Sequence, residues 1–141
     1  MTQIIINTDG GARGNPGPAG IGYVIKKDET VTLEKGEYIG ETTNNQAEYE
    51  ALVRALTALK TLLGNETDAT IEARLDSELV VKQLRREYKV KDAGLKTQFA
   101  KVQEILATLP KVSFVHVMRE DNSEADALVN EALDAQSAKI Q

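Results

Sequence analysis

Residues 4–11 read Ile4-Ile5-Ile6-Asn7-Thr8-Asp9-Gly10-Gly11 and form the first patterned stretch of the chain. Three β-branched residues in a row predict a short strand that is buried on both faces. Asp9 precedes a glycine pair, where an aspartate often begins a turn. In α/β sheets, however, ligand sites lie beyond the carboxyl ends of parallel strands. Asp9 is therefore a candidate functional residue as well as an ordinary turn residue.

The rest of the chain alternates strands and helices. A glycine- and proline-rich connector is expected over residues 10–20, and the tight Asp28-Glu29 link predicts a hairpin. The predicted strands cover residues 22–27, 30–38, 69–75 and 111–118, and the predicted helices cover 43–63, 77–88, 91–109 and 123–136. Strands joined by tight turns pair antiparallel, and strands joined through helices pair parallel. This order predicts an α/β fold with one mixed sheet and helices packed on it, in a single domain over residues 1–141.

The composition narrows the classes of function. The formal net charge of the 141 residues is −5, whereas nucleic-acid-binding domains are usually basic. Any phosphate-binding surface is therefore expected to be local or bridged by metal ions. The absence of cysteine excludes disulfides and thiolate metal sites. The chain shows neither a signal-peptide pattern nor an apolar run long enough to span a bilayer, so we expect a cytoplasmic protein without a membrane partner.

Glu48 lies on the apolar face of the helix predicted over residues 43–63, four residues before the first leucine of its stripe. The stripe comprises Leu52, Leu56, Leu59 and Leu63. A solvated surface does not explain a carboxylate in that position. One explanation is a first-turn carboxylate that stabilises the helix dipole. The other is a charge beside the core that requires a cation or a hydrogen-bond network.

Two aspartates stand at the starts of predicted helices. Asp76 ends a strand and begins a helix, where aspartate is a favoured N-cap. Asp126 follows Ser123 by three positions, as in a capping box, and heads an apolar stripe with Val129 and Leu133. Capping explains each aspartate taken alone.

Together, Asp9, Glu48, Asp76 and Asp126 put four carboxylates at strand ends and helix starts, along what the topology predicts to be one edge of one sheet. All-oxygen ligands suit hard divalent cations, chiefly Mg²⁺ or Mn²⁺. Two such ions can activate a water and stabilise the leaving oxygen of a phosphodiester. The four residues are therefore candidate metal ligands and catalytic residues.

Five motifs, spread over nearly the whole chain, resemble type 1 ribonuclease H. They are Thr-Asp-Gly-Gly at 8–11, Gly-Asn-Pro-Gly-Pro at 14–18, Thr-Thr-Asn-Asn-Gln-Ala-Glu at 42–48, Leu-Asp-Ser at 75–77 and Asn-Ser-Glu-Ala-Asp at 122–126. The third motif combined with the first is highly specific, whereas a lone Asp-Gly-Gly is a weak signal. The resemblance implies a five-stranded mixed sheet, with three antiparallel strands followed by parallel ones and helices on both faces.

The resemblance also implies an endonuclease that hydrolyses the RNA strand of RNA–DNA hybrids by two-metal-ion catalysis, with the four carboxylates as ligands. It implies that the hybrid binds near Gly11, Asn15, Thr43, Asn44, Asn45, Gln46 and Asn122. Amide side chains suit this role because they can donate and accept toward 2′-hydroxyls and base edges of the minor groove. Ordinary turn and cap chemistry is the alternative at each position. We expect a monomer with no obligate protein partner.

The chain departs from better-known family members in two places. The loop Arg119-Glu120-Asp121-Asn122 lacks the histidine that many of them carry, which makes Arg119 and Glu120 candidate auxiliary residues. The only histidine, His116, is expected to be packed within the last strand. The basic stretch over residues 85–96 is short, and hybrid binding and a solvated helix end explain it equally well.

Two other functions stay open. A nuclease of the same fold could prefer double-stranded RNA or RNA–DNA junctions, because A-form shape and 2′-hydroxyl contacts serve all of these substrates. A catalytically silent hybrid-binding module is the other alternative, against which the complete set of four carboxylates argues.

Overall fold

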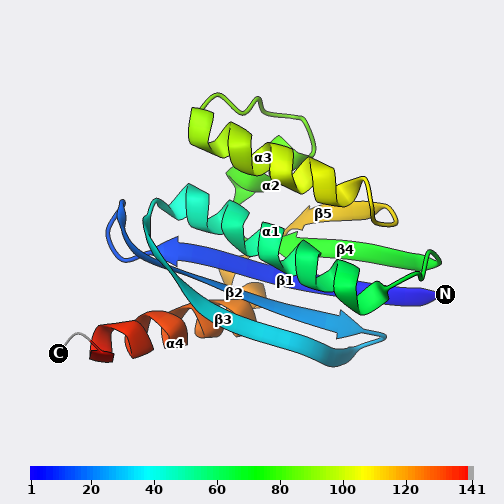
Figure 1. The fold of residues 1–141 in the computed structure, drawn as a ribbon, viewed down its shortest axis with the longest axis horizontal. Coiled ribbons are helices and arrows are strands. Elements are labelled where there is room, and N and C mark those ends of the chain that lie inside the picture. The colour runs from blue at the N-terminus through cyan, green and yellow to red at the C-terminus, as the bar shows by residue number, and fades with distance from the viewer. Residues whose placement is uncertain (140–141) are drawn as a thin grey trace.

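A single sheet forms the centre of the molecule (Figure 1). In the computed structural model, which describes residues 1–139, five strands pair in the order β3-β2-β1-β4-β5. They are β1 (Thr2–Ala12), β2 (Gly17–Lys27), β3 (Thr30–Thr42), β4 (Ala69–Leu75) and β5 (Val112–His116). The first three strands pair antiparallel, and β4 runs parallel to β1 and to β5. The predicted mixed sheet is confirmed.

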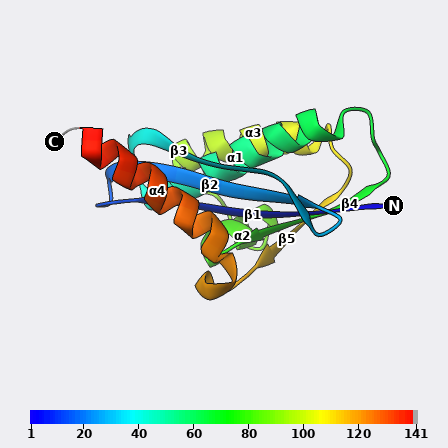
Figure 2. The same ribbon diagram turned by 90° about the horizontal axis from the view of Figure 1, so that it is seen from below.

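Helices cover both faces of this sheet, as predicted. They are α1 (Asn44–Leu63), α2 (Glu78–Leu84), α3 (Ala93–Leu106) and α4 (Ser123–Lys139), with a 3₁₀ turn, η1 (Arg119–Asn122), before α4. α1 and α3 lie side by side on one face, whereas α4 crosses the opposite face (Figure 1 and Figure 2). Within residues 1–139, the helices are too short or too polar to cross a membrane.

The apolar stripe of α1 supplies much of the core. Thr43 caps the start of the helix by accepting the Gln46 N–H, and Gly64 ends it with a positive φ. Leu52, Leu56 and Leu59 are fully buried, and Leu63 is nearly so. Full burial of a leucine side chain contributes about 1.5–3 kcal/mol, so this stripe fixes α1 against the sheet.

The Asp28-Glu29 hairpin is confirmed, since both residues have the positive φ that a tight two-residue turn requires. Several other boundaries were predicted wrongly, among them the end of β3, which extends to Thr42 and not to residue 38. The connector expected over 10–20 is largely strand, because residues 10–12 pair with residues 19–21. The helix expected over 77–88 ends at Leu84, and Arg86 soon follows with φ 65°, a conformation that does not continue an α-helix.

Gly10 is the point where the backbones of β1 and α1 touch. A Cβ at this position would collide with the Ala47 carbonyl group and would come within 2.7 Å of the Glu48 amide nitrogen. Only glycine fits such a close approach. Gly22 has the same function on the opposite face, where a Cβ would collide with the Ala125 carbonyl oxygen of α4. Gly10 and Gly22 are therefore points at which α1 and α4 closely approach the two faces of the sheet.

We expect Gly10→Ala to destabilise the protein by about 1–3 kcal/mol, because overpacking forces β1 and α1 apart. Gly11→Ala is the matched control, since a Cβ there meets only the Asn44 side chain, at 3.9 Å. Urea denaturation of the two variants makes the comparison. Equal free energies of unfolding for the two variants would show that α1 can move away from β1 without loss of stability.

Candidate active site

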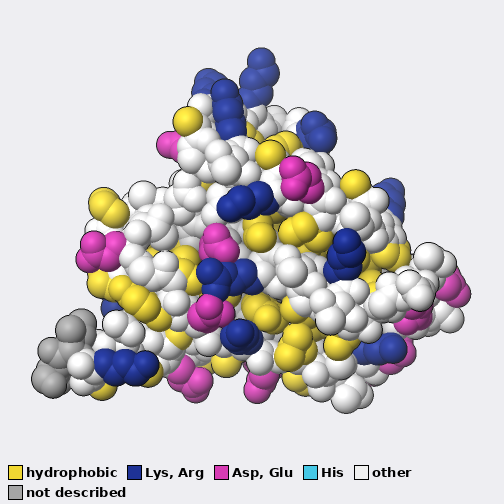
Figure 3. All heavy atoms as spheres, viewed as in Figure 1, with side chains coloured by type: hydrophobic (Ala, Val, Ile, Leu, Met, Phe, Trp, Pro, Cys, Tyr) yellow, Lys and Arg dark blue, Asp and Glu magenta, His cyan; other side chains and the backbone are white. Residues whose placement is uncertain are grey.

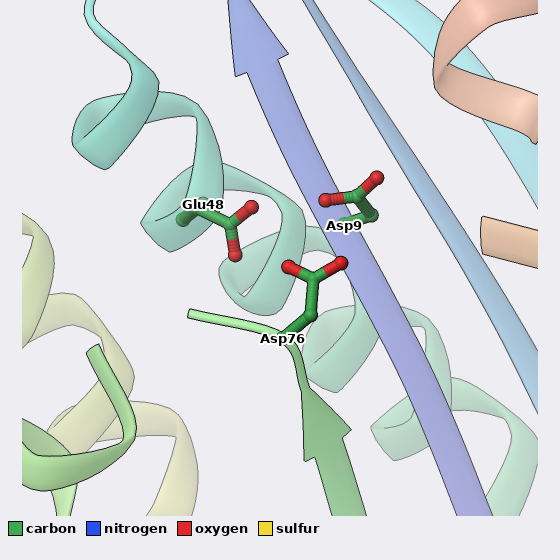
Figure 4. A group of neighbouring side chains, drawn as sticks. All are labelled: Asp9, Glu48 and Asp76. Atoms are coloured by element: carbon green, nitrogen blue, oxygen red, sulfur yellow. The ribbon is translucent and has the colours of Figure 1, made fainter. Parts of the chain in front are cut away.

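The parallel pairing of β1 with β4 brings Asp9 and Asp76 together. The strands stay in register up to Thr8 and Leu75, so Asp9 and Asp76 occupy the next position on each. Neighbouring strands lie about 4.8 Å apart. Figure 4 shows the two carboxylates directed toward one another from the two strands.

Glu48 completes the group from α1. It lies near the start of the helix, and its Oε1 accepts a hydrogen bond from the Gly10 N–H at 3.0 Å. The bond is within reach because α1 touches β1 at Gly10. One carboxylate oxygen from each of Asp9, Glu48 and Asp76 lies within 4.8 Å of the others (Figure 4). We call these three residues the carboxylate cluster.

Burial and mutual repulsion raise the pKa values within the carboxylate cluster. Asp9 and Glu48 are only 7% and 6% exposed. Burial first, and then the charges of Asp76 and Asp126, raise the pKa of Asp9 from 3.8 to about 7, despite a hydrogen bond with Glu48. Burial and the negative charge of Asp9 raise the pKa of Glu48 well above its ordinary value. The cluster therefore favours a bound proton or cation.

The carboxylate cluster fits a divalent cation. Its donors are carboxylate oxygens, the ligand type that hard divalent ions prefer. Glu48 Oε2 is buried and has no hydrogen-bond partner within residues 1–139. Burying such an oxygen is unfavourable unless a cation or a proton satisfies it.

Asp126 approaches the carboxylate cluster from α4, on the other face of the sheet. It is half-buried in the first turn of that helix, and its charge contributes to the raised pKa of Asp9. It is not one of the three carboxylates that lie within 4.8 Å of one another. Asn130, one turn later in α4, donates a hydrogen bond to Asp126 Oδ2 at 3.3 Å. The structure thus brings the four predicted carboxylates to one place, with Asp126 at the margin.

An open cavity of about 610 Å³ lies in front of the carboxylates. Its lining includes all four of them together with Gly11, Arg13, Asn44, Asn45 and Arg119. A second cavity of about 280 Å³ shares Asn45 with the first and is also lined by Asn15, Thr43 and Gln46. Six of the seven predicted substrate-binding residues therefore line one of these two adjoining cavities, and three of the six line the cavity of the carboxylates.

Two of these six residues, Asn15 and Asn44, also organise the segment that they occupy. Asn15 Oδ1 accepts the Asn44 N–H at 3.1 Å, and Asn44 Oδ1 accepts the Ala12 N–H at 2.8 Å. The end of β1, the following turn and the start of α1 are thereby tied together. This geometry suits both a turn-forming and a substrate-binding role.

Asn122, the seventh predicted substrate-binding residue, is placed differently. It is 1% exposed. Its Nδ2 donates to the Thr8 carbonyl oxygen at 2.8 Å and to Asp76 Oδ2 at 3.3 Å. Asn122 therefore contacts the protein interior and Asp76, and it is not part of the lining of the cavity within residues 1–139.

The two candidate auxiliary residues differ in whether they line the cavity. Arg119 lines the cavity, whereas Glu120 is exposed and lies outside the lining formed by the described residues. His116 is the last residue of β5, but it is exposed, so the expectation that it is packed was wrong.

Two residues that contact this site were missed in the sequence. Asn7 donates a hydrogen bond to Asn122, and Asn130 donates one to Asp126. Their spacing in the sequence could have identified them. Asn7 stands two residues before Asp9, so the two share a face of the strand, and Asn130 stands four residues after Asp126, so the two share a face of the helix.

The raised pKa of Asp9 gives a prediction about stability. The folded protein holds a proton on Asp9 that the unfolded chain releases near pH 4, so this residue destabilises the metal-free protein increasingly as the pH rises from about 4 to about 7. We therefore expect Asp9→Asn to raise the free energy of unfolding at pH 8 by about 1–3 kcal/mol. The gain should shrink toward zero near pH 4.

Chemical denaturation in EDTA at pH 4 and pH 8 measures this difference. Asp68→Asn is the matched control, because Asp68 is exposed and precedes the opposite end of β4. A loss of stability in the Asp9 variant at pH 8 would contradict the prediction.

Comparison with known proteins places this site in a family. The family model described as "Reverse transcriptase-like" matches residues 7–132. Ribonuclease HI of Halobacterium salinarum is 44% identical over 127 residues, and the bifunctional protein Rv2228c of Mycobacterium tuberculosis is 38% identical over 135 residues. The matched regions cover 89% and 94% of this chain but only 62% and 36% of those two relatives.

A solved structure matches over nearly the full length of both chains. LC11-RNase H1, isolated from compost by a metagenomic approach, superposes with a TM-score of 0.91 and 54% identity, covering 96% of this chain and 99% of its own. Identity at that level over nearly all of both chains means that this chain belongs to the type 1 ribonuclease H family.

Proposed function

We propose that the chain is an endonuclease that hydrolyses the RNA strand of RNA–DNA hybrids, with divalent metal ions held at the carboxylate cluster. The observation that carries this proposal is the cluster itself, three carboxylate oxygens within 4.8 Å of one another beside an open cavity. LC11-RNase H1 has been solved in complex with an RNA/DNA hybrid, and that chain is 53% identical to this one over 98% of its length. The likeness supports the same substrate here.

In this proposal Asp9, Glu48 and Asp76 hold a Mg²⁺ or Mn²⁺ ion, and Asp126 helps to hold a second. Bound divalent ions lower the pKa of an attacking water and offset the charge of the leaving oxygen. The Gly10 N–H holds Glu48 in one orientation and leaves Oε2 available as a ligand. The position of the Glu48 side chain is thus set by a backbone contact.

The residues beside the carboxylates suit a hybrid. At the start of α1 the backbone N–H groups of Asn44 and Gln46 already bond to the side chains of Asn15 and Thr43, so we assign contact with the hybrid to the amide side chains there. Asn44, Asn45 and Gln46 stand at this end of α1 and can both donate to and accept from a 2′-hydroxyl. Arg119 lines the same cavity, and we assign it to phosphate binding because a guanidinium stays protonated.

We expect Asp9→Asn, Glu48→Gln and Asp76→Asn each to lower cleavage of a hybrid by about a thousandfold or more, since each removes a charge from the metal site. The substitutions preserve side-chain shape, so folding should be retained. The measurement is kcat and KM with Mg²⁺ on an end-labelled RNA–DNA hybrid, with EDTA as the metal-free reference. Asp68→Asn again serves as the control and should cleave normally.

The same assay separates the proposal from its alternatives. Faster cleavage of an RNA duplex or an RNA–DNA junction would assign another substrate to the site. Tight hybrid binding without cleavage in either Mg²⁺ or Mn²⁺ would make the chain a binding module. Near-normal activity of the Asp9 or Asp76 variant would contradict the metal-site assignment.

A basic surface over the segment between α2 and α3 provides a second candidate contact with the hybrid. Figure 3 shows lysine and arginine side chains gathered there, at the top of the view. The exposed basic residues of this surface are Arg85, Arg86, Lys89, Lys91 and Lys96. Three of them line a cavity of about 340 Å³ together with Tyr88 and Phe99. Cations beside aromatic rings are typical of surfaces that bind nucleic acids.

We expect the triple variant Arg85→Glu, Arg86→Glu, Lys89→Glu to raise KM for the hybrid about tenfold or more while kcat changes little, because these residues lie outside the cavity of the carboxylates. Reversal of the exposed lysines Lys60, Lys101 and Lys111 makes a control with the same net charge. Steady-state kinetics at two salt concentrations measures both variants. An unchanged KM in the first variant would show that this surface is only solvated.

A further inference from the structure

Asn7 is a buried polar residue at the centre of the sheet. It is 9% exposed and follows three isoleucines in β1. Successive side chains of a strand alternate between faces, so Asn7 and Asp9 lie on the same face of β1. A buried amide is favourable only when its donors and acceptor find partners.

The partner of Asn7 leads to the carboxylate cluster. Asn7 Nδ2 donates to Asn122 Oδ1 at 3.0 Å. Asn122 Nδ2 in turn donates to the Thr8 carbonyl oxygen at 2.8 Å and to Asp76 Oδ2 at 3.3 Å. These bonds join the middle of β1, η1 and the end of β4 into one buried network.

The polarity of this network has a consequence for Asp76. A carboxamide accepts at one end and donates at the other. Because Asn7 occupies the accepting end of Asn122, the donating end is directed at Asp76. In the opposite orientation Asn122 would direct its oxygen at the Thr8 carbonyl and the Asp76 carboxylate, which is repulsive. Within residues 1–139, the bond from Asn122 is the one hydrogen bond made to the Asp76 carboxylate.

We propose that Asn7 is a positioning residue, which sets the orientation of Asn122 and through it holds the Asp76 carboxylate toward Asp9 and Glu48. Asn122 is itself too deeply buried to reach a substrate, so both amides act from inside the protein. The inference rests on the proposed function only for its activity measurement. Partners of this kind behind metal ligands typically change metal affinity or activity 10- to 100-fold.

The test is Asn7→Leu, which keeps the approximate size of the side chain and removes the amide. We expect the Kd for Mg²⁺, measured by calorimetry without nucleic acid, to rise about tenfold or more. In hybrid cleavage, kcat should fall while KM for the hybrid stays within about twofold, because the cavity surface is untouched. In an Asn122→Ala background, Asn7→Leu should have no further effect on the Kd, since the link to Asp76 is already lost.

Gln83→Leu is the matched control. Gln83 is another buried amide, 5% exposed, and its Oε1 accepts the Tyr49 hydroxyl at 2.7 Å, away from the carboxylates. The Gln83→Leu substitution should lower the free energy of unfolding without changing the Kd for Mg²⁺. The same pattern in Asn7→Leu, lower stability with unchanged Kd and kcat, would make Asn7 a purely structural residue and overturn the proposal.

The unmodified protein gives a second test if Asn7→Leu does not fold. Titration of ¹⁵N-labelled protein with Mg²⁺ should shift the side-chain NH₂ resonances of both Asn122 and Asn7. Resonances of Asn7 that stay fixed while those near Asp76 move would overturn the proposal. Magnesium binding by a protein that cleaves no hybrid would contradict the proposed function and leave this inference standing.

Discussion

The backbone contact between β1 and α1 at Gly10 is the constraint on which the candidate site depends. Without a side chain at this position the helix approaches closely enough for Glu48 to accept the Gly10 N–H at 3.0 Å. That single bond places a carboxylate from one face of the sheet beside Asp9 in the strand. The leucine stripe of α1 stabilises the contact, so core packing and site geometry have the same cause.

The convergence of the other carboxylates follows from topology. Parallel pairing of β1 with β4 places Asp9 and Asp76 side by side, and the close packing of α4 over Gly22 brings Asp126 near from the opposite face. Four separate segments of the chain thus contribute one carboxylate each. Burial first, and then repulsion between the neighbouring carboxylates, raise the pKa values of Asp9 and Glu48, so this arrangement opposes folding at neutral pH in the absence of a cation.

Amide side chains near these carboxylates act both at the surface and in the interior of the protein. Asn15 and Asn44 form hydrogen bonds that tie the end of β1 to the start of α1, and they remain at the surface where a nucleic acid could reach them. Asn7 and Asn122 form hydrogen bonds beneath the surface, behind Asp76. The same residue type therefore has different functions according to burial, which a sequence motif does not record.

The sequence by itself determined the order of strands and helices, the buried face of α1 and the four carboxylates, because helix periodicity, capping residues and strand ends are local patterns. Only the tertiary structure decided that four of the five glycines over 10–20 lie in strands, that Asn122 is internal and linked to Asn7, and that Arg119 but not Glu120 lines the cavity. These features depend on sheet register and on the distance between a helix and a sheet. Both are set by packing between residues far apart in the chain, so no local pattern contains them.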